Sequence, residues 1–554
     1  MNTKGKDLGK HQGRERVKIH RLRTGVPGLD EILSGEDAGE GARGGLPEFS
    51  FNIIAGAPGS GKTTLVHQIM FANASTECPA LYFTVLGEPA IKMLRYQQQF
   101  SFFDMSKVDG AIRFINLSKV VLEHDLNAVL DAIIKEVEAS KAKIVVVDSF
   151  RTVVRRAQAV GTGAAPGELE LQGFVQRLAL HLTSWQATSF LVGEYVEGEM
   201  RDNPVFTVAD GLFWLYQSVE RNSIVRKLQI MKLRGQNSVS GLHTFRLTDD
   251  GVQCFPRTFG LSPKTGHVKG RRRVSTGIVK LDEMLGGGIP EGESMLLAGP
   301  SGSGKSTLGM QFIDEGLKRG EPGIVAMFEE LPAEHVQRAK MFGIDFDTPQ
   351  KEGKLKIIYL RPLDLSVDET VHEIVRSVKE MGAKRLVIDS LVGFELALAP
   401  GFREDFRESL YRMIAAVTRL GVTIVSTVEI EEEFTSMNLS KFTVSFLADD
   451  IVRMRYVSIN GQMRKMLMVI KMRRSRHSID MREYQITNKG VVVGEPLRGY
   501  RALTSGIPEP WSTESGKEVP EVRVEKPEKP SRSVKDRVQK DAPVKGRRRG
   551  RGAS

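Results

Sequence analysis

Short apolar, β-branched runs alternate along this chain with longer stretches in which apolar residues recur at helical spacing. The runs lie at residues 51–55, 81–85, 143–149 and 189–192, and again at 295–298, 324–328, 385–390 and 422–426. Strands that are apolar almost throughout and that alternate with helices are typical of a parallel sheet buried on both faces. We therefore predict an α/β fold in which each half of the chain forms a mainly parallel sheet covered by helices on both faces.

A phosphate-binding motif follows the first apolar run of each half. Residues 56–64 and 299–307 both read G-x-x-x-x-G-K-[ST] and both open a helical stretch. Glycines in such a loop let backbone N–H groups approach phosphate oxygens, and the helix N-terminus adds a positive dipole. The motif predicts two ATP sites, formed by Gly59, Ser60, Gly61, Lys62, Thr63 and Thr64, and by Gly302, Ser303, Gly304, Lys305, Ser306 and Thr307.

The repeat extends beyond these loops. Residues 24–33 return as 276–285, the strand that ends in Asp148 returns as the one ending in Asp389, and 232–235 returns as 471–474. Shared features in one order predict two homologous P-loop domains of the RecA-like type. The expected organisation is a disordered basic arm at 1–18, a first ATPase domain at 19–256, a basic linker at 257–272, a second ATPase domain at 273–500 and a disordered basic tail at 501–554.

Composition limits where the protein acts. The 554 residues contain no apolar run of membrane-spanning length and no apolar N-terminal signal, so we expect a cytoplasmic protein without a membrane partner. The formal net charge is +11, and many basic residues lie at the two ends. Such runs are commonly solvated, and they bind polyanions only non-specifically, so nucleic acid is expected at most as a non-specific partner.

The motif also assigns chemistry to single residues. Lys62 and Lys305 are expected to neutralise phosphate charge, which makes them catalytic as well as binding residues. ATP bound to Mg²⁺ is the expected cofactor, and its metal ligands would be Thr63 and Asp148 in the first half and Ser306 and Asp389 in the second half. An aspartate at the end of a strand is also a common helix N-cap. The interpretation of Asp148 and Asp389 as metal ligands therefore rests on their position after the P-loop in each half.

With these motifs in view, residues 21–494 resemble the KaiC family of circadian-clock ATPases, which is a duplicated form of the RecA-like fold. The resemblance implies a homo-hexameric ring with ATP bound between neighbouring subunits. It also implies that a K-x-R signature reaches the phosphates of the next subunit, through Lys232 and Arg234 and through Lys471 and Arg473. A solvated strand end is the alternative interpretation of these four residues.

The two halves differ at the activating carboxylate. Glu329 and Glu330 follow the second strand of the second half and match the catalytic pair of the family. In the first half, Leu86 and Gly87 occupy the positions aligned with this pair, and Glu88 lies one position beyond them. We therefore predict slow or absent hydrolysis at the first site, unless Glu88 or the strand-end Glu194 substitutes for the pair.

The resemblance also raises a kinase activity. In the KaiC family, a pair of hydroxyl residues accepts phosphate, and Ser445 and Phe446 align with that pair. Ser445 is therefore a candidate phosphosite. Because Phe446 has no hydroxyl, a two-step phosphorylation cycle is not expected. The alternative is an ordinary hydroxyl on a segment that packs toward an interface.

The sequence thus favours an oligomeric ATPase with candidate serine/threonine autokinase activity, acting as a signalling or clock-type switch on partner proteins that it does not identify. A RecA-like DNA-handling ATPase and a scaffold stabilised by nucleotide are the alternatives.

Overall fold

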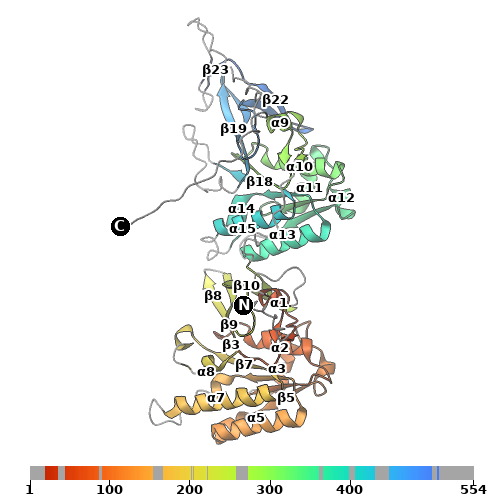
Figure 1. The fold of residues 1–554 in the computed structure, drawn as a ribbon. Helices are drawn as coiled ribbons and strands as arrows, with labels where there is room; N and C mark the ends of the chain where they lie inside the picture. The colour runs from red at the N-terminus through yellow and green to blue at the C-terminus, as the bar shows by residue number, and fades with distance from the viewer. Residues whose placement is uncertain are drawn as a thin grey trace, which may run out of the picture. The chain divides into compact units, whose positions relative to one another are not determined.

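Figure 1 shows the fold in a computed structural model of the chain. The structure describes residues 19–34, 44–85, 90–153, 166–200, 203, 205–220, 223–257, 272–360, 366–398, 406–430, 448–501 and 508–510. The predicted basic arm, most of the linker and nearly all of the tail lie outside the described residues, so the domain boundaries placed there stay predictions.

The first half forms one nine-stranded sheet in the order β11-β10-β9-β8-β3-β7-β6-β4-β5. Its parallel strands are β3 (Phe51–Gly56), β4 (Ala80–Thr84), β5 (Ile112–Asn116), β6 (Ile144–Asp148), β7 (Thr188–Glu194) and β8 (Gly211–Glu220). An antiparallel extension follows, made of β9 (Ser223–Leu233), β10 (Leu242–Thr248) and β11 (Gly251–Phe255). The sequence predicted the parallel part and not the extension.

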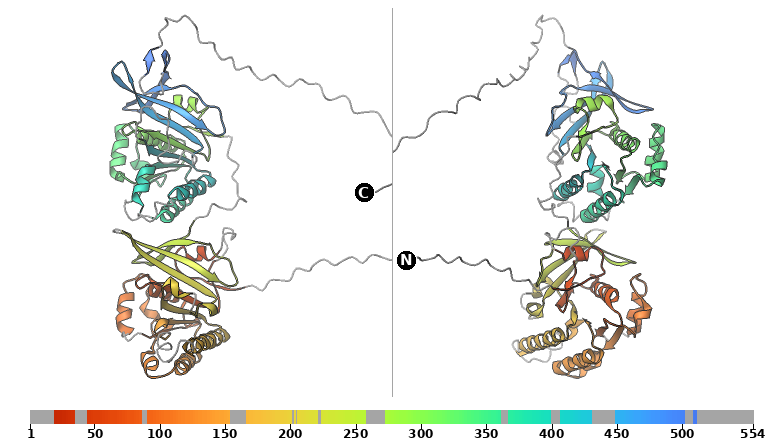
Figure 2. Two further views of the ribbon diagram at one scale, coloured as in Figure 1. Left: turned by 90° about the vertical axis from the view of Figure 1, so that its left-hand side faces the viewer. Right: turned by 45° about the vertical axis from the view of Figure 1, so that its right-hand side comes forward.

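The second half repeats this sheet in the order β16-β15-β17-β18-β14-β19-β20-β21-β22. Its parallel strands are β14 (Ser294–Gly299), β15 (Gly323–Met327), β16 (Leu355–Tyr359), β17 (Arg385–Asp389), β18 (Thr423–Glu429) and β19 (Asp450–Ile459). The antiparallel strands are β20 (Gln462–Met472), β21 (Arg482–Thr487) and β22 (Gly490–Pro496). Both views of Figure 2 show the long β8–β9 and β19–β20 ribbons, the latter in blue.

Helices cover both faces of each sheet, as predicted. In the first half, Phe51 and Ile53 of β3 face the core under α5 (Leu126–Ser140) and α7 (Pro166–Ser184). Ile54, on the opposite face, packs in the core under α2 (Lys62–Asn73). Figure 1 shows α5 and α7 side by side, apart from α2. In the second half α13 (Val367–Met381) and α15 (Phe406–Arg419) cover one face, and α10 (Lys305–Lys318) covers the other.

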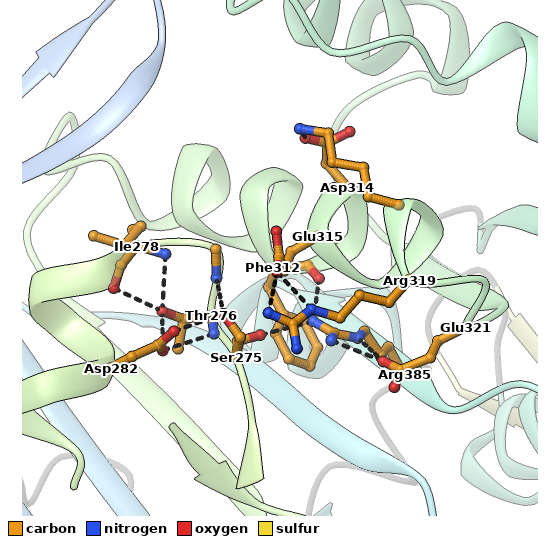
Figure 3. Close-up of polar contacts among 12 residues, drawn as sticks. Ser275, Thr276, Ile278, Asp282, Phe312, Asp314, Glu315, Arg319, Glu321 and Arg385 are labelled. Atoms are coloured by element: carbon orange, nitrogen blue, oxygen red, sulfur yellow. Dashed lines mark hydrogen bonds and ion pairs between the residues drawn. The ribbon is translucent and has the colours of Figure 1, made fainter. Parts of the chain in front are cut away.

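The repeated motif that opens each half, at residues 24–33 and 276–285, is held by hydrogen bonds between its threonine and its aspartate. The backbone N–H and the hydroxyl of Thr276 both donate to one carboxylate oxygen of Asp282, at 2.8 and 2.7 Å (Figure 3). Thr24 and Asp30 make the same pair of bonds in the first half, at 3.0 and 2.8 Å. The repeated Thr-Gly and Leu-Asp-Glu residues therefore fix the turn before the first short helix.

A buried arginine ties this turn to the second sheet. Arg385, at the start of β17, is 1% exposed and donates to the backbone oxygens of Ser275 and Phe312 and to the Glu321 carboxylate, at 2.7 to 2.8 Å (Figure 3). Its guanidinium carbon lies 4.7 Å from the centre of the Phe312 ring. The register of the two halves puts Ile144 at the matching place.

Arg385→Ala should destabilise the second domain, because the nearly buried Glu321 carboxylate loses its buried partner and keeps the exposed Arg272, and the backbone oxygens of Ser275 and Phe312 lose a donor. We expect a loss of about 3 kcal/mol in the free energy of unfolding, seen as a lower melting temperature. Arg376→Ala, on the exposed face of α13, is the matched control and should change the melting temperature little. If Arg385→Ala had the same melting temperature as the control, the stabilising role of Arg385 would be contradicted.

Candidate active sites

Each P-loop joins the end of a buried strand to the start of a long helix. Gly61 and Gly304 precede α2 and α10 with φ of 95°, a left-handed conformation that glycine adopts without strain. Both helices begin without a side-chain cap, so their first N–H groups are available to an anion. The loop carbonyls hold the motif lysines: Lys62 Nζ lies 2.7 Å from the Ala57 oxygen, and Lys305 Nζ 2.8 Å from the Pro300 oxygen.

A hydroxyl and a carboxylate converge beside the first P-loop. Asp148 ends β6, and its Oδ2 accepts hydrogen bonds from Thr63 at 2.8 Å and from Tyr82 at 2.6 Å. Burial raises the pKa of the Asp148 carboxyl, and these two bonds oppose the shift. The structure thus brings together the two residues that the sequence predicted as ligands of Mg²⁺. Tyr82 is a neighbour that the motif did not reveal.

The second site has a related arrangement. Asp389 ends β17, and its Oδ1 accepts a hydrogen bond from Thr427 of β18 at 2.5 Å. Ser306 is the second residue of α10, directly after the motif lysine. Val325 occupies the place of Tyr82 on the matching strand, so the tyrosine contact belongs to the first site.

An acidic residue ends the strand next to each P-loop strand. By register, Glu194 lies beside Gly56, and Glu429 lies beside Gly299. Burial lowers the pKa of Lys62, and Glu194 opposes that shift most strongly. Glu429 does the same for Lys305. Glu194, named from the sequence as a substitute base, therefore lies within electrostatic reach of the phosphate-binding lysine.

The predicted carboxylate pair separates into two different environments. Glu329 accepts a hydrogen bond from the Ser390 hydroxyl at 2.8 Å, and it is one of three carboxylates that oppose the lowering of the Lys305 pKa by burial. A Cβ atom at Gly393 would lie 2.5 Å from the Glu329 carboxylate, so this glycine leaves room for it. Glu329 therefore belongs to the site that contains Lys305.

Glu330 is held by the helix that follows. Its Oε2 accepts hydrogen bonds from Arg338 at 2.6 Å and from Nδ1 of His335 at 3.1 Å, both on α11 (Pro332–Met341). Burial lowers the pKa of His335, so its ring is neutral at pH 7 and donates its single N–H to this bond. Glu330 thus anchors the start of α11. The corresponding residues of the first half, Leu86 to Glu88, lie outside the described residues.

The first site opens into a cavity of about 470 Å³, within the size range of ligand pockets. Its walls include the predicted residues Lys62, Thr63, Thr64, Asp148 and Glu194. They also include Tyr82 and Arg151, which no motif indicated. Arg151 follows Asp148 by three positions, and that spacing is the only signal that could have pointed to it.

The K-x-R residues lie away from the P-loop of their own domain. The backbone of Arg234 bonds to Asp210, and Asp210 bonds to Phe51 at the start of β3, whereas the P-loop follows the end of that strand. The strand separates them by roughly 17 Å at about 3.3 Å per residue. Arg473 and Asp449 repeat this arrangement at the start of β14.

The side chains at these strand ends are accessible. Arg234 is 61% exposed in its pair with Asp210, and Arg473 is 49% exposed in its pair with Asp449. The neighbouring lysines donate to backbone oxygens, Lys232 to Thr207 at 3.0 Å and Lys471 to Ala448 at 2.8 Å. These cations are therefore remote from the P-loop of their own domain. The candidate phosphosite Ser445 lies outside the described residues.

The fold and the two P-loops define the chain as a tandem pair of RecA-like P-loop domains. A family model described as "ATPase: KaiC" matches residues 22–258 and 274–498. The chain belongs to this KaiC ATPase family, which confirms the resemblance seen in the sequence. In the described part of the chain, every helix is too short or too polar to cross a membrane.

Relatives match along most of the chain. The circadian clock oscillator protein KaiC of Picosynechococcus sp. is 28% identical over 506 residues, which cover 88% of this chain and 92% of that protein. The circadian clock oscillator protein KaiC 1 of Synechocystis sp. is 28% identical over 508 residues, covering 89% and 92%. The KaiC of Synechococcus elongatus is 26% identical over 507 residues, covering 89% and 93%.

The two glutamates of the pair should have unequal effects on catalysis. Because Glu329 lies near Lys305 and Glu330 is bound to α11, Glu329→Gln should lower the rate of phosphate release about a hundredfold. Glu330→Gln should lower it less than about fivefold, but reduce the melting temperature by weakening the contact with Arg338. Glu334→Gln, at an exposed position of α11, is the control. Equal rate losses in the first two variants would count against the separate roles.

Proposed function

We propose that the chain is an oligomeric ATP-hydrolysing switch that binds one ATP in each half and hydrolyses it mainly in the second domain. The observation that carries this proposal is the asymmetry at the activating carboxylate. Glu329 lies within electrostatic reach of Lys305 and accepts a hydrogen bond from Ser390, whereas Leu86 and Gly87 occupy the aligned positions of the first half. The first site would then hold ATP for long periods while the second turns over.

The residues present fit ATP with Mg²⁺. The hydroxyls of Ser60 and Ser303, in the two P-loops, are buried without a hydrogen-bond partner among the described residues, which suits a loop built to surround phosphates. Thr63 and Asp148 offer the hard oxygen ligands that Mg²⁺ prefers. When bound, the metal would neutralise phosphate charge. Thr63 and Asp148 would hold it in the first site, and Ser306 and Asp389 in the second.

Hydrolysis in the second site would use a small set of side chains. Lys305 would leave the Pro300 carbonyl and bind the terminal phosphate oxygens, where negative charge is concentrated. Glu329 would orient the attacking water and accept its proton as the oxygen bonds to phosphorus and the bond to ADP breaks. Ser390 would keep the Glu329 carboxylate in place by donating to it. The products are ADP and inorganic phosphate.

We further propose that subunits complete one another's sites. The exposed Arg234 and Arg473 lie at the end of the sheet opposite the P-loop of their own domain. In this proposal they contact the phosphates bound by a neighbouring subunit. A head-to-tail interface of this kind closes into a ring, and the hexamer expected from the family is such a ring. Partner proteins would read the state of this ring. Autophosphorylation at Ser445 rests on the sequence alignment alone.

Phosphate release and label retention should be followed together in full-length protein supplied with Mg²⁺ and γ-labelled ATP. We expect released phosphate, with or without retained label, and a labelled peptide containing Ser445 would add the autokinase activity. Strong stimulation of release by DNA would favour the DNA-handling alternative. If neither signal is seen, the nucleotide-stabilised scaffold becomes the better account.

Removing the motif lysines one at a time should separate the two sites. Lys305→Ala should abolish at least about nine-tenths of phosphate release, because the second site loses its main phosphate cation. Lys62→Ala should leave most of the release intact, provided that native mass measurements find the same assembly. Loss of most activity in an assembled Lys62→Ala protein would contradict hydrolysis mainly in the second domain.

Mixing two inactive variants tests the intersubunit site. Glu329→Gln chains keep Arg473, and Arg473→Ala chains keep Glu329, so some interfaces of a mixed assembly would contain both intact residues. Random mixing in equal amounts should restore about a quarter of the wild-type rate, since half of the sites and half of the arginines are intact. A mixture no more active than the mean of its two components would place Arg473 outside the neighbour's site.

A further inference from the structure

The first nucleotide site contains an arginine at a position where the second domain has a valine. Arg151 lies in helical residues 150–153, just after β6, and lines the same cavity as Lys62, Thr63 and Asp148. Counting three positions from the matching Asp389 gives Val392, which packs against the apolar core of the second domain. Among the described residues, the position that carries this positive charge in the first site is therefore apolar in the second.

The guanidinium of Arg151 is held by one carboxylate. Its two terminal nitrogens donate to the two oxygens of Glu199, at 2.8 and 2.7 Å. One of them also donates to the backbone oxygen of Glu194, and the guanidinium carbon lies 5.4 Å from the centre of the Tyr195 ring. The side chain is 20% exposed, so the ion pair stands at the edge of the cavity and within reach of solvent.

The charge balance of the cavity explains why a ligand would draw on this arginine. Lys62 already faces the carboxylates of Asp148 and Glu194. A nucleoside triphosphate stays anionic when one divalent metal ion is bound to it, and one lysine with two carboxylate neighbours compensates the remaining phosphate charge poorly. A guanidinium binds phosphate with the same two-pronged geometry that it uses for carboxylate, so exchange of Glu199 for a phosphate group preserves its hydrogen bonds.

Glu199 is suited to be the group that is released. It lies in η2 (Glu197–Met200), a single short 3₁₀ turn, and its Oε2 also accepts a hydrogen bond from the backbone of Val196 at 3.2 Å. This turn begins three residues after Glu194, the last residue of β7, which is part of the cavity wall. Release of Glu199 would therefore alter a segment connected to the site.

We propose that Arg151 binds the terminal phosphate of a nucleoside triphosphate in the first site, and that Glu199 holds it when no terminal phosphate is present. This rests on the proposed function, because it requires that the first site binds ATP. A site with this second cation and without the Glu-Glu pair distinguishes ATP from ADP while hydrolysing it slowly. Arg151 then acts as the residue by which the first domain detects the triphosphate.

The test uses the full chain carrying Lys305→Ala, so that binding reports the first site. Affinities for ADP and for the imido analogue of ATP would be measured by displacement of a fluorescent ADP, with a melting curve for every variant. Arg151→Gln should weaken binding of the analogue at least about tenfold, since it loses a charge-assisted bond, and change ADP affinity less than about twofold. Glu199→Gln should strengthen analogue binding by freeing the arginine.

Arg177→Gln is the matched control, because Arg177 bonds to Asn127 on the helical face and should leave both affinities unchanged. Equal weakening of ADP and analogue by Arg151→Gln, or no weakening of either, would overturn the proposal and leave Arg151 as a clamp for η2. If Arg151→Gln fails to fold, Glu199→Gln decides, and an unchanged ratio of the two affinities overturns the proposal. A parent protein that binds neither nucleotide would overturn the proposed ATP binding at the first site as well.

Discussion

The left-handed glycine turn between a buried strand and a helix N-terminus is the constraint on which both sites depend. With φ of 95° at Gly61 and Gly304, the loop returns over the end of its strand and directs free N–H groups toward one point. The same turn folds the motif lysine back onto the loop carbonyls. Carboxylates at the ends of neighbouring parallel strands then face this point, because such ends share one edge of a sheet.

The two halves share this loop geometry but differ in the side chains around the loop. Asp148 accepts hydrogen bonds from Tyr82 and Thr63, whereas its counterpart Asp389 accepts one from Thr427. The second site contains Glu329 near its lysine, and the first contains Arg151 paired with Glu199. A proton acceptor at one site and an additional cation at the other are the basis of our proposal that one domain turns ATP over while the other retains it.

Much of the fold could be predicted from sequence because its signals are local. Continuous apolar strands and the two P-loop motifs are encoded in short segments. The structure confirms the strands and the position of each P-loop between a strand and a helix, whereas ATP binding stays a prediction. The antiparallel extension was missed, since β9 mixes polar with apolar residues and lacks the continuous apolar run of the parallel strands. Arg151 and Tyr82 were missed because their roles arise from contacts between segments distant in sequence. The separate environments of Glu329 and Glu330 likewise depend on contacts with Ser390 and Arg338, and the sequence assigned a role to neither residue.

The most direct test of unequal sites is a single turnover of bound nucleotide. Full-length protein would be loaded with labelled ATP, freed of excess nucleotide, and quenched at intervals to measure bound ATP and ADP per chain. The account predicts two phases of about equal size, in which one ATP per chain is converted quickly and the other persists. A single phase that converts both nucleotides at one rate would contradict it.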